Sequence, residues 1–74
     1  MEDRIYQLIE SWEKFLEKDG LTCWGIAIRY YDYKIEEAQS NRSRIFKYIE
    51  LLKDEGRIFS HFDFNGDIRY NTHQ

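Results

Sequence analysis

The sequence predicts a single α+β domain over residues 1–74, with the element order α-β-α-α-β-β and a small antiparallel sheet. Three observations predict this class. Apolar residues recur at helical spacing in two separate segments, residues 21–33 alternate as in a strand, and an Asn-Gly pair separates two aromatic-rich stretches near the C-terminus. A chain of 74 residues needs a dense core, and the 18% aromatic content supplies large side chains for it.

Residues 3–18 predict an amphipathic helix, because apolar side chains recur every three or four positions and charged residues occupy the remaining faces. Asp3 is in a position to cap the start of this helix. Asp19-Gly20 is expected to end it, since glycine adopts the left-handed conformation that follows a helix C-terminus without strain.

Residues 21–33 fit two predictions, a strand and a helix. Alternate residues from Trp24 to Tyr30 would share one side of a strand, but a helix with apolar positions from Trp24 to Tyr31 fits nearly as well. We favour the strand, because β-branched and aromatic residues dominate and Gly25 would weaken the interior of a helix.

Two helices are expected next, a short one over residues 34–39 and a longer one from about Arg42 to Glu55. The residues between them suit helix ends, since Ser40, Asn41 and Ser43 all have side chains that hydrogen-bond to nearby backbone groups. The longer helix carries an apolar stripe, which predicts that one side of it packs on the core.

A β-hairpin is expected at the C-terminus. Gly56 ends the preceding helix, and residues 57–64 and 67–72 form two strands. Asn65-Gly66 joins them and predicts a type I′ turn, which needs positive φ at both central residues.

Charge and cysteine content exclude several classes of protein. Cys23 is the only cysteine, so the chain can form neither an internal disulfide nor a zinc-binding cysteine pair, which favours a reducing, cytoplasmic location. No apolar run approaches the roughly 18 residues of a membrane span. The acidic, polar N-terminus is unlike a signal peptide. We therefore expect a soluble protein that does not associate with a membrane.

The formal net charge of −3 argues, taken alone, against binding to nucleic acid. The distribution of charge is more informative, because residues 41–47 carry Arg42, Arg44 and Lys47 without an acidic residue. Positive charge is thus concentrated at the start of the longer helix.

The segment SRIFKYIELLKDEGRI followed by FDFNGDIRY resembles the recognition helix, the acidic-Gly stop and the wing of winged helix-turn-helix transcription regulators. The resemblance covers residues 34–72. It implies a winged-helix-like fold and binding of double-stranded DNA, with KIEEAQ as the short helix and Ala38 as the small residue that lets two helices cross closely.

The resemblance also implies a set of DNA contacts. Arg42 and Ser43 would lie at the start of the recognition helix, and Arg44, Lys47 and Tyr48 would face the major groove or its rim. On the wing, His61 and Arg69 would lie near phosphates. A homodimer through the first helix or residues 21–33 would double the number of basic side chains.

No enzyme is expected from the sequence, and no metal or other cofactor. Asp63, Asn65 and Asp67 match only the opening of a calcium-binding loop, whose glycine and closing glutamate are misplaced or missing. His61 has no second histidine at metal-binding spacing, and Cys23 has no histidine nearby in sequence to activate it. These residues are expected to be structural.

A second function, from another class, fits the aromatic content and the acidic first helix. It is a small acidic inhibitor or adaptor of the phage type, which binds a host protein through an aromatic surface. The aromatic residues that exceed the needs of a core of this size are Tyr6, Tyr30, Tyr31, Tyr33, Tyr48, Phe62, Phe64 and Tyr70.

Overall fold

The structure is a computed structural model that describes residues 1–15 and 19–73. It confirms the α+β class, with four helices and a three-stranded antiparallel sheet in the described residues. In chain order the elements are α1 (Glu2–Phe15), β1 (Leu21–Thr22), α2 (Cys23–Tyr30), α3 (Ile35–Ser40), α4 (Arg42–Asp54), β2 (Phe59–Phe62) and β3 (Ile68–Asn71). The helix α2 is additional to the predicted order.

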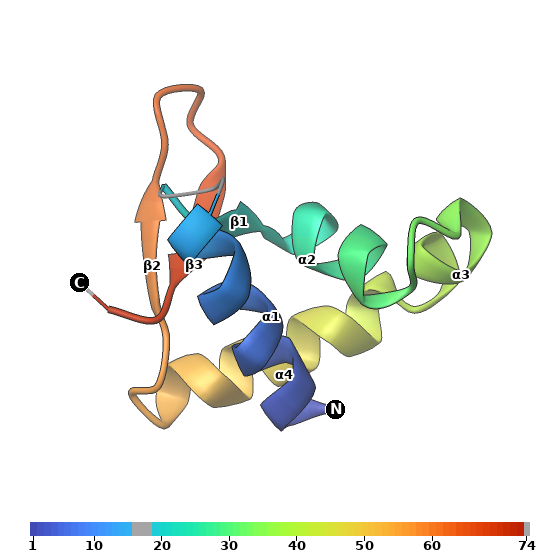
Figure 1. Cartoon of the computed structure of the whole chain (residues 1–74), viewed down its shortest axis with the longest axis horizontal. Helices are drawn as coiled ribbons and strands as arrows, with labels where there is room; N and C mark the ends of the chain where they lie inside the picture. Colours follow the sequence, from blue (N-terminus) through green and yellow to red (C-terminus); the bar gives the residue numbers. More distant parts are fainter. Residues whose placement is uncertain (16–18, 74) are drawn as a thin grey trace.

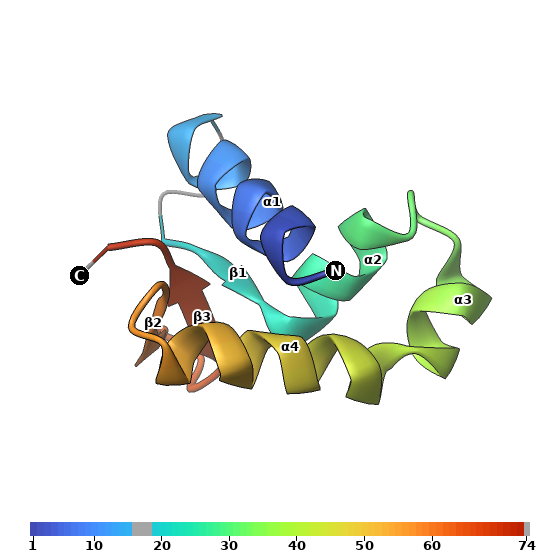
Figure 2. The same cartoon turned by 90° about the horizontal axis from the view of Figure 1, so that it is seen from below.

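The elements are arranged around β1 and α2. Figure 2 shows these two elements between α1 on one side and α4 on the other. The β2–β3 hairpin stands away from the C-terminal end of α4, whereas α3 lies at the opposite end of the molecule (Figure 1). The sheet has the order β1-β3-β2, so β3 is its central strand.

The core lies between the helices and the inner part of the sheet. Every helix contributes to it, since each buries apolar side chains that its periodic pattern places on one side. The residues with no exposed surface are Ile5, Ile9, Ile26, Ala27, Ala38, Ile45, Ile49, Leu52 and Ile58.

The predicted strand over residues 21–33 is wrong beyond Thr22, where the chain enters α2. A local cap marks the start of this helix, because Thr22 Oγ1 accepts a hydrogen bond from the Gly25 amide at 3.0 Å. A Cβ at Gly25 would lie 3.2 Å from both Thr22 Oγ1 and Arg29 Nη1, so the glycine gives these two side chains room. The helical alternative is correct for residues 23–30.

The ends of α1 differ from the prediction in detail. The helix begins at Glu2, so Asp3 lies inside its first turn and does not cap it. The predicted continuation through residues 16–18 lies outside the described residues. Gly20 has a φ of +91°, a conformation that glycine adopts without strain. A Cβ there would lie 2.5 Å from the Tyr70 carbonyl oxygen, so the close approach of β3 also requires glycine.

The two expected helices after α2 are confirmed within about one residue at each end. Asn41 lies between them and donates from Nδ2 to the Glu37 carbonyl at 2.9 Å. Gly56, with a φ of +74°, ends α4 as predicted. The amides of Gly56 and Arg57 donate to the carbonyls of Lys53 and Leu52, each at 3.0 Å, which is a Schellman motif.

The hairpin is confirmed, but its turn is not the predicted type I′ turn. Gly66 has a positive φ of 84° and Asn65 does not. The Asp63 amide donates to the Asp67 carbonyl and the Gly66 amide donates to the Asp63 carbonyl, which defines a three-residue loop. Asp63 Oδ1 also accepts from the amides of Asn65 and Asp67 at 2.8 and 2.9 Å. This carboxylate orders the turn, and the strands are shorter than predicted.

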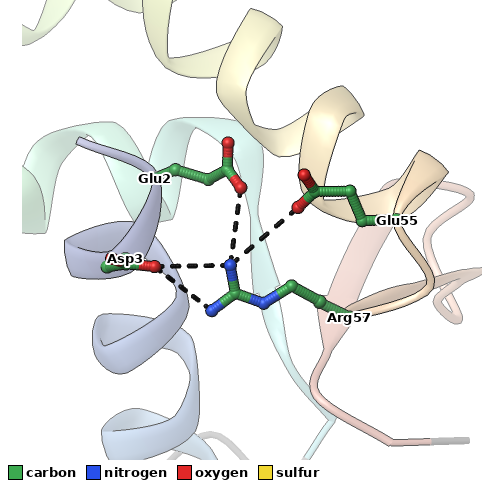
Figure 3. Close-up of polar contacts among 4 residues, drawn as sticks. All are labelled: Glu2, Asp3, Glu55 and Arg57. Carbon is green, nitrogen blue, oxygen red and sulfur yellow. Dashed lines mark hydrogen bonds and ion pairs between the residues drawn. The ribbon is translucent and has the colours of Figure 1, made fainter.

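Arg57 joins the two helices that flank the core. Its guanidinium contacts Glu2 and Asp3 of α1 at 3.4 and 3.3 Å and Glu55 at 3.9 Å (Figure 3). Its guanidinium carbon also lies 4.8 Å from the centre of the Tyr6 ring. The C-terminal end of α4 is thereby fixed to the start of α1.

Candidate nucleic-acid interface

The start of α4 presents the basic residues that the sequence singled out. Arg42, Ser43, Arg44 and Lys47 are all exposed. Within residues 1–15 and 19–73, no carboxylate forms an ion pair with Arg42, Arg44 or Lys47. Their charge is therefore open to solvent.

These three side chains lie on two opposite sides of the helix and do not share one face of it. Each helical residue turns by about 100°, so Arg44 lies about 200° around the axis from Arg42 and Lys47 lies about 140° from it. Arg42 turns toward α2, where its guanidinium carbon lies 5.6 Å from the centre of the Trp24 ring. Arg44 and Lys47 lie on the opposite side of the helix from Arg42.

The backbone at the start of α4 also favours an anion. The first amide groups of a helix have no intrahelical partner and carry partial positive charge. In the described part of the chain, α4 is the only helix that has neither an acidic residue in its first turn nor a side-chain cap. Asn41, the residue at the cap position, has turned its side chain back toward α3.

A groove of about 730 Å³ adjoins this end of α4. Its walls are the first turns of α4, with Arg42 and Phe46, and the hairpin residues 66–68. Residues 22–24 and Tyr70 complete the lining. The groove thus combines aromatic and aliphatic side chains with the guanidinium of Arg42.

Cys23 lines the same groove and is half-buried. Burial raises the pKa of its thiol, and the nearby Arg42 guanidinium opposes the shift only in part. A thiol that holds its proton is a poor nucleophile. The arrangement gives Cys23 no activating base and leaves it as a lining residue.

The three other predicted contact residues have different positions. Tyr48 is half-buried and packs against the core, whereas His61 is exposed on β2. Arg69 donates from Nε to Asp63 Oδ2 at 2.7 Å and from Nη1 to the Gly20 carbonyl at 2.8 Å. The hydrogen bond from Arg69 is the main reason that the pKa of Asp63 is lowered. Arg69 holds the hairpin turn and the start of β1 in place.

Sequence reasoning missed Trp24 and Phe46 as parts of the site. Trp24 was assigned to a strand, and the tertiary structure places it beside Arg42. Phe46 lies next to the apolar stripe of α4, is 45% exposed and lines the groove. The one feature of the sequence that could have predicted the position of Phe46 is that this apolar residue lies just outside the apolar stripe of α4.

The described residues contain no group of three or more histidine, cysteine or carboxylate side chains that could hold a metal ion. The Asp63 carboxylate, first in the calcium-like pattern, is engaged by backbone amides and Arg69. Among the helices of residues 1–15 and 19–73, none is both long and apolar enough to cross a membrane.

Comparison with known proteins adds no family assignment. No protein-family model, no curated protein and no solved structure matches the chain.

Proposed function

We propose that the protein binds double-stranded DNA in the manner of a winged helix, with the start of α4 in the major groove and the β2–β3 hairpin as the wing. The order of elements from α3 to β3 supports this proposal, because a short helix, a longer helix and a hairpin follow one another. Ala38 is buried completely where α3 packs near α4, as the proposed helix pair requires.

The observation that carries the proposal is the uncapped, cationic start of α4. Arg42 and Arg44 lie in the first turn of α4, which has no acidic side chain and no side-chain cap, and Lys47 follows in the second turn. Phosphate groups satisfy the backbone amides of such a helix start and pair with basic side chains. Ser43 adds a hydroxyl donor on the exposed side.

The contacts can be divided by position. Arg44 and Lys47 project from the helix and would contact the groove edges or the phosphates on one side. Arg42, beside the groove and the hairpin, would contact the backbone that passes between helix and wing. His61 is an exposed wing residue that remains in this set. Arg69 and Tyr48 support the fold in this proposal and do not contact DNA directly.

The expected affinity of one copy is low. Three basic side chains are few beside the roughly 6–10 phosphate contacts of strong binders, and non-specific association is typically about 10⁻⁴–10⁻⁶ M. The net charge of −3 lowers it further. Because the affinity comes from phosphate contacts, binding should weaken as salt is raised.

The test is duplex binding measured by fluorescence anisotropy at low and moderate salt. The variant Arg42→Ala, Arg44→Ala, Lys47→Ala should bind about tenfold or more weakly than the parent, with a salt slope lower by about 2–3, because each lost phosphate contact removes about 0.9. Its far-ultraviolet spectrum should be unchanged, since all three side chains are exposed.

A matched control removes the same charge from other surfaces. The variant Lys14→Ala, Lys34→Ala, Lys53→Ala also loses three exposed cations, so both variants change the net charge from −3 to −6. It should retain most of the duplex affinity. Equal loss of affinity in both variants would show that only the net charge matters, and the proposed interface would be wrong.

A second candidate function is the binding of a protein partner. It is favoured by apolar side chains exposed on the hairpin and the groove wall, namely Phe46, Phe62, Phe64 and Ile68. Phe64 at the hairpin tip is fully exposed, and exposed apolar side chains that gather on one part of a surface are typical of protein-binding sites. If the parent protein fails to bind duplex even at about 10⁻⁴ M, the weak limit of non-specific association, this candidate is preferred.

A further inference from the structure

The strand β2 occupies one border of the sheet, and its outer backbone edge is a candidate for pairing. The strand order β1-β3-β2 leaves β2 with one neighbour, and no strand of residues 1–15 or 19–73 pairs with its other side. Figure 1 shows β2 at the left border of the fold. Unpaired strand edges present rows of amide and carbonyl groups that pair readily with another strand.

The register identifies which groups face outward. The Asp63 amide donates across the hairpin to the Asp67 carbonyl, so Asp63 directs its backbone groups toward β3. Inward and outward directions alternate along an antiparallel strand. The backbone amide and carbonyl of His61, which pairs with Arg69, therefore also point toward β3. The backbone amides and carbonyls of Ser60 and Phe62 point to the free edge.

We propose that two copies of the protein associate by antiparallel pairing of their β2 strands about a twofold axis at His61. In this arrangement, Ser60 pairs with Phe62 of the partner subunit and Phe62 pairs with Ser60 of the partner subunit. All four outward backbone groups of each β2 then form hydrogen bonds, and the result is one six-stranded sheet. The inference stands apart from the proposed binding of DNA.

A second copy is the occupant that this edge fits best. Antiparallel pairing of identical strands across a twofold axis places every donor opposite an acceptor without further design. The sequence of β2, FSHF, contains no lysine, glutamate, aspartate or proline, which are the residues that usually prevent edge pairing. Two such strands therefore bring no lysine, arginine or carboxylate side chain against its own copy.

The exposed side chains agree with the same register. Phe62 is 73% exposed and lies opposite Ile68, so both side chains are on one face of the sheet. With the axis at His61, Phe62 would lie diagonally across from Phe62 of the partner subunit on that face, within the reach of aromatic rings. Registers centred on Ser60 or Phe62 would instead recruit Ile58, which is buried, or Phe64, which lies in the turn.

The pairing closes at two copies. The opposite border of the sheet is β1, which is two residues long and runs directly into α2. So short an edge cannot accept another copy, and fibres are not expected. Pairing of four-residue strands buries less area than the roughly 1,200–2,000 Å² of stable interfaces, so the dimer should be weak and dependent on concentration.

The experiment is sedimentation velocity at protein concentrations from about 1 μM to about 1 mM. The parent protein should shift with concentration toward about twice its mass of 9.1 kDa. Ser60→Pro removes an outward amide that the internal ladder does not use, so the fold should be retained while the dissociation constant rises roughly tenfold or more. Ser60→Val keeps the amide and is the matched control, which should dimerise like the parent.

A second variant decides the matter if Ser60→Pro fails to fold. His61→Glu places two carboxylates opposite each other at the twofold axis, yet within one copy it faces Arg69 across the hairpin. It should fold and remain a monomer. The proposal is overturned if the parent is a monomer at every concentration, or if either folded variant dimerises as tightly as the parent.

Discussion

The two ends of α4 carry the same kind of side chain in opposite surroundings. At the C-terminal end, Arg57 contacts the carboxylates of Glu2, Asp3 and Glu55 and lies over the Tyr6 ring. At the N-terminal end, Arg42 and its basic neighbours face solvent, and no carboxylate of the described residues pairs with them. We call the C-terminal end, where Arg57 pairs with carboxylates, the closed end of α4. The N-terminal end, where the basic side chains have no carboxylate partner among the described residues, is the open end.

This difference shows that the role of an arginine depends on which carboxylates the fold brings to it. The acidic start of α1 lies beside the C-terminal end of α4, so Arg57 contributes to folding (Figure 3). The open end receives no such partner. Positive charge that folding does not use remains available to a polyanion, and the following predictions test this contrast from the largest effect to the smallest.

The largest effect is expected from Ile45→Ala at the open end. Ile45 is completely buried, so its truncation should lower the free energy of unfolding by about 2–5 kcal/mol. The adjacent change Arg44→Ala should alter stability by no more than about 0.5 kcal/mol and should weaken duplex binding. Urea unfolding and anisotropy on both variants measure this. A large loss of stability in Arg44→Ala would show that the open end is structural after all.

The closed end should respond in the opposite way. Arg57→Ala removes the contacts with two helices and should lower the free energy of unfolding by about 1–2 kcal/mol, since partly exposed ion pairs and one cation–π contact are each modest. Duplex affinity should be unchanged. Lys53→Ala, an exposed cation nearby, is the control for lost charge. Reduced DNA binding by Arg57→Ala alone would contradict the contrast.

The closed end of α4 has a positive φ at a glycine, Gly56, whereas the turn before α3 has a positive φ of +65° at a bulky residue, Tyr33. Gly56→Ala should cost about 1 kcal/mol, because alanine is strained there although nothing blocks its Cβ. Tyr33→Gly should gain about 0.5–1 kcal/mol by relieving the same strain. Thermal unfolding measures the expected loss of stability in Gly56→Ala and the expected gain in Tyr33→Gly. A loss of stability in Tyr33→Gly would show that the tyrosine ring stabilises the fold.

The smallest effect concerns pH at the closed end. A hydrogen bond with the Glu55 carboxyl, followed by desolvation and repulsion from Glu55, raises the pKa of Glu2 above its ordinary 4.5, and Arg57 only partly opposes this. The folded state thus holds this proton more tightly than the unfolded state. The resulting stabilisation is complete below about pH 4.5 and is lost as the pH rises through the raised pKa.

Lowering the pH from about 7 to about 4.5 should therefore raise the melting temperature of the parent relative to Glu2→Gln, which cannot titrate. Melting curves of both proteins at each pH measure the difference. Parallel curves would mean that Glu2 does not bind its proton more tightly in the folded state.

The site could be predicted from the sequence in part. The exposure of Arg42, Arg44 and Lys47 follows from their places off the apolar stripe of α4, which is a local property of the helix. The role of Arg69 could not be predicted in the same way. Its partners are Asp63, six residues away, and the carbonyl of Gly20, 49 residues away, and only the folded sheet brings the latter close.

The sequence by itself determined the class of the fold, the position of α4, its end at Gly56 and the existence of the hairpin. These features depend on spacing and on residues that act within one or two turns of chain. The tertiary structure decided that residues 23–30 form α2, because the burial of Ile26 and Ala27 against the other helices outweighs a short alternating pattern. It also decided that Arg57 pairs with carboxylates of α1, since this pairing requires carboxylates from a distant part of the chain to meet it.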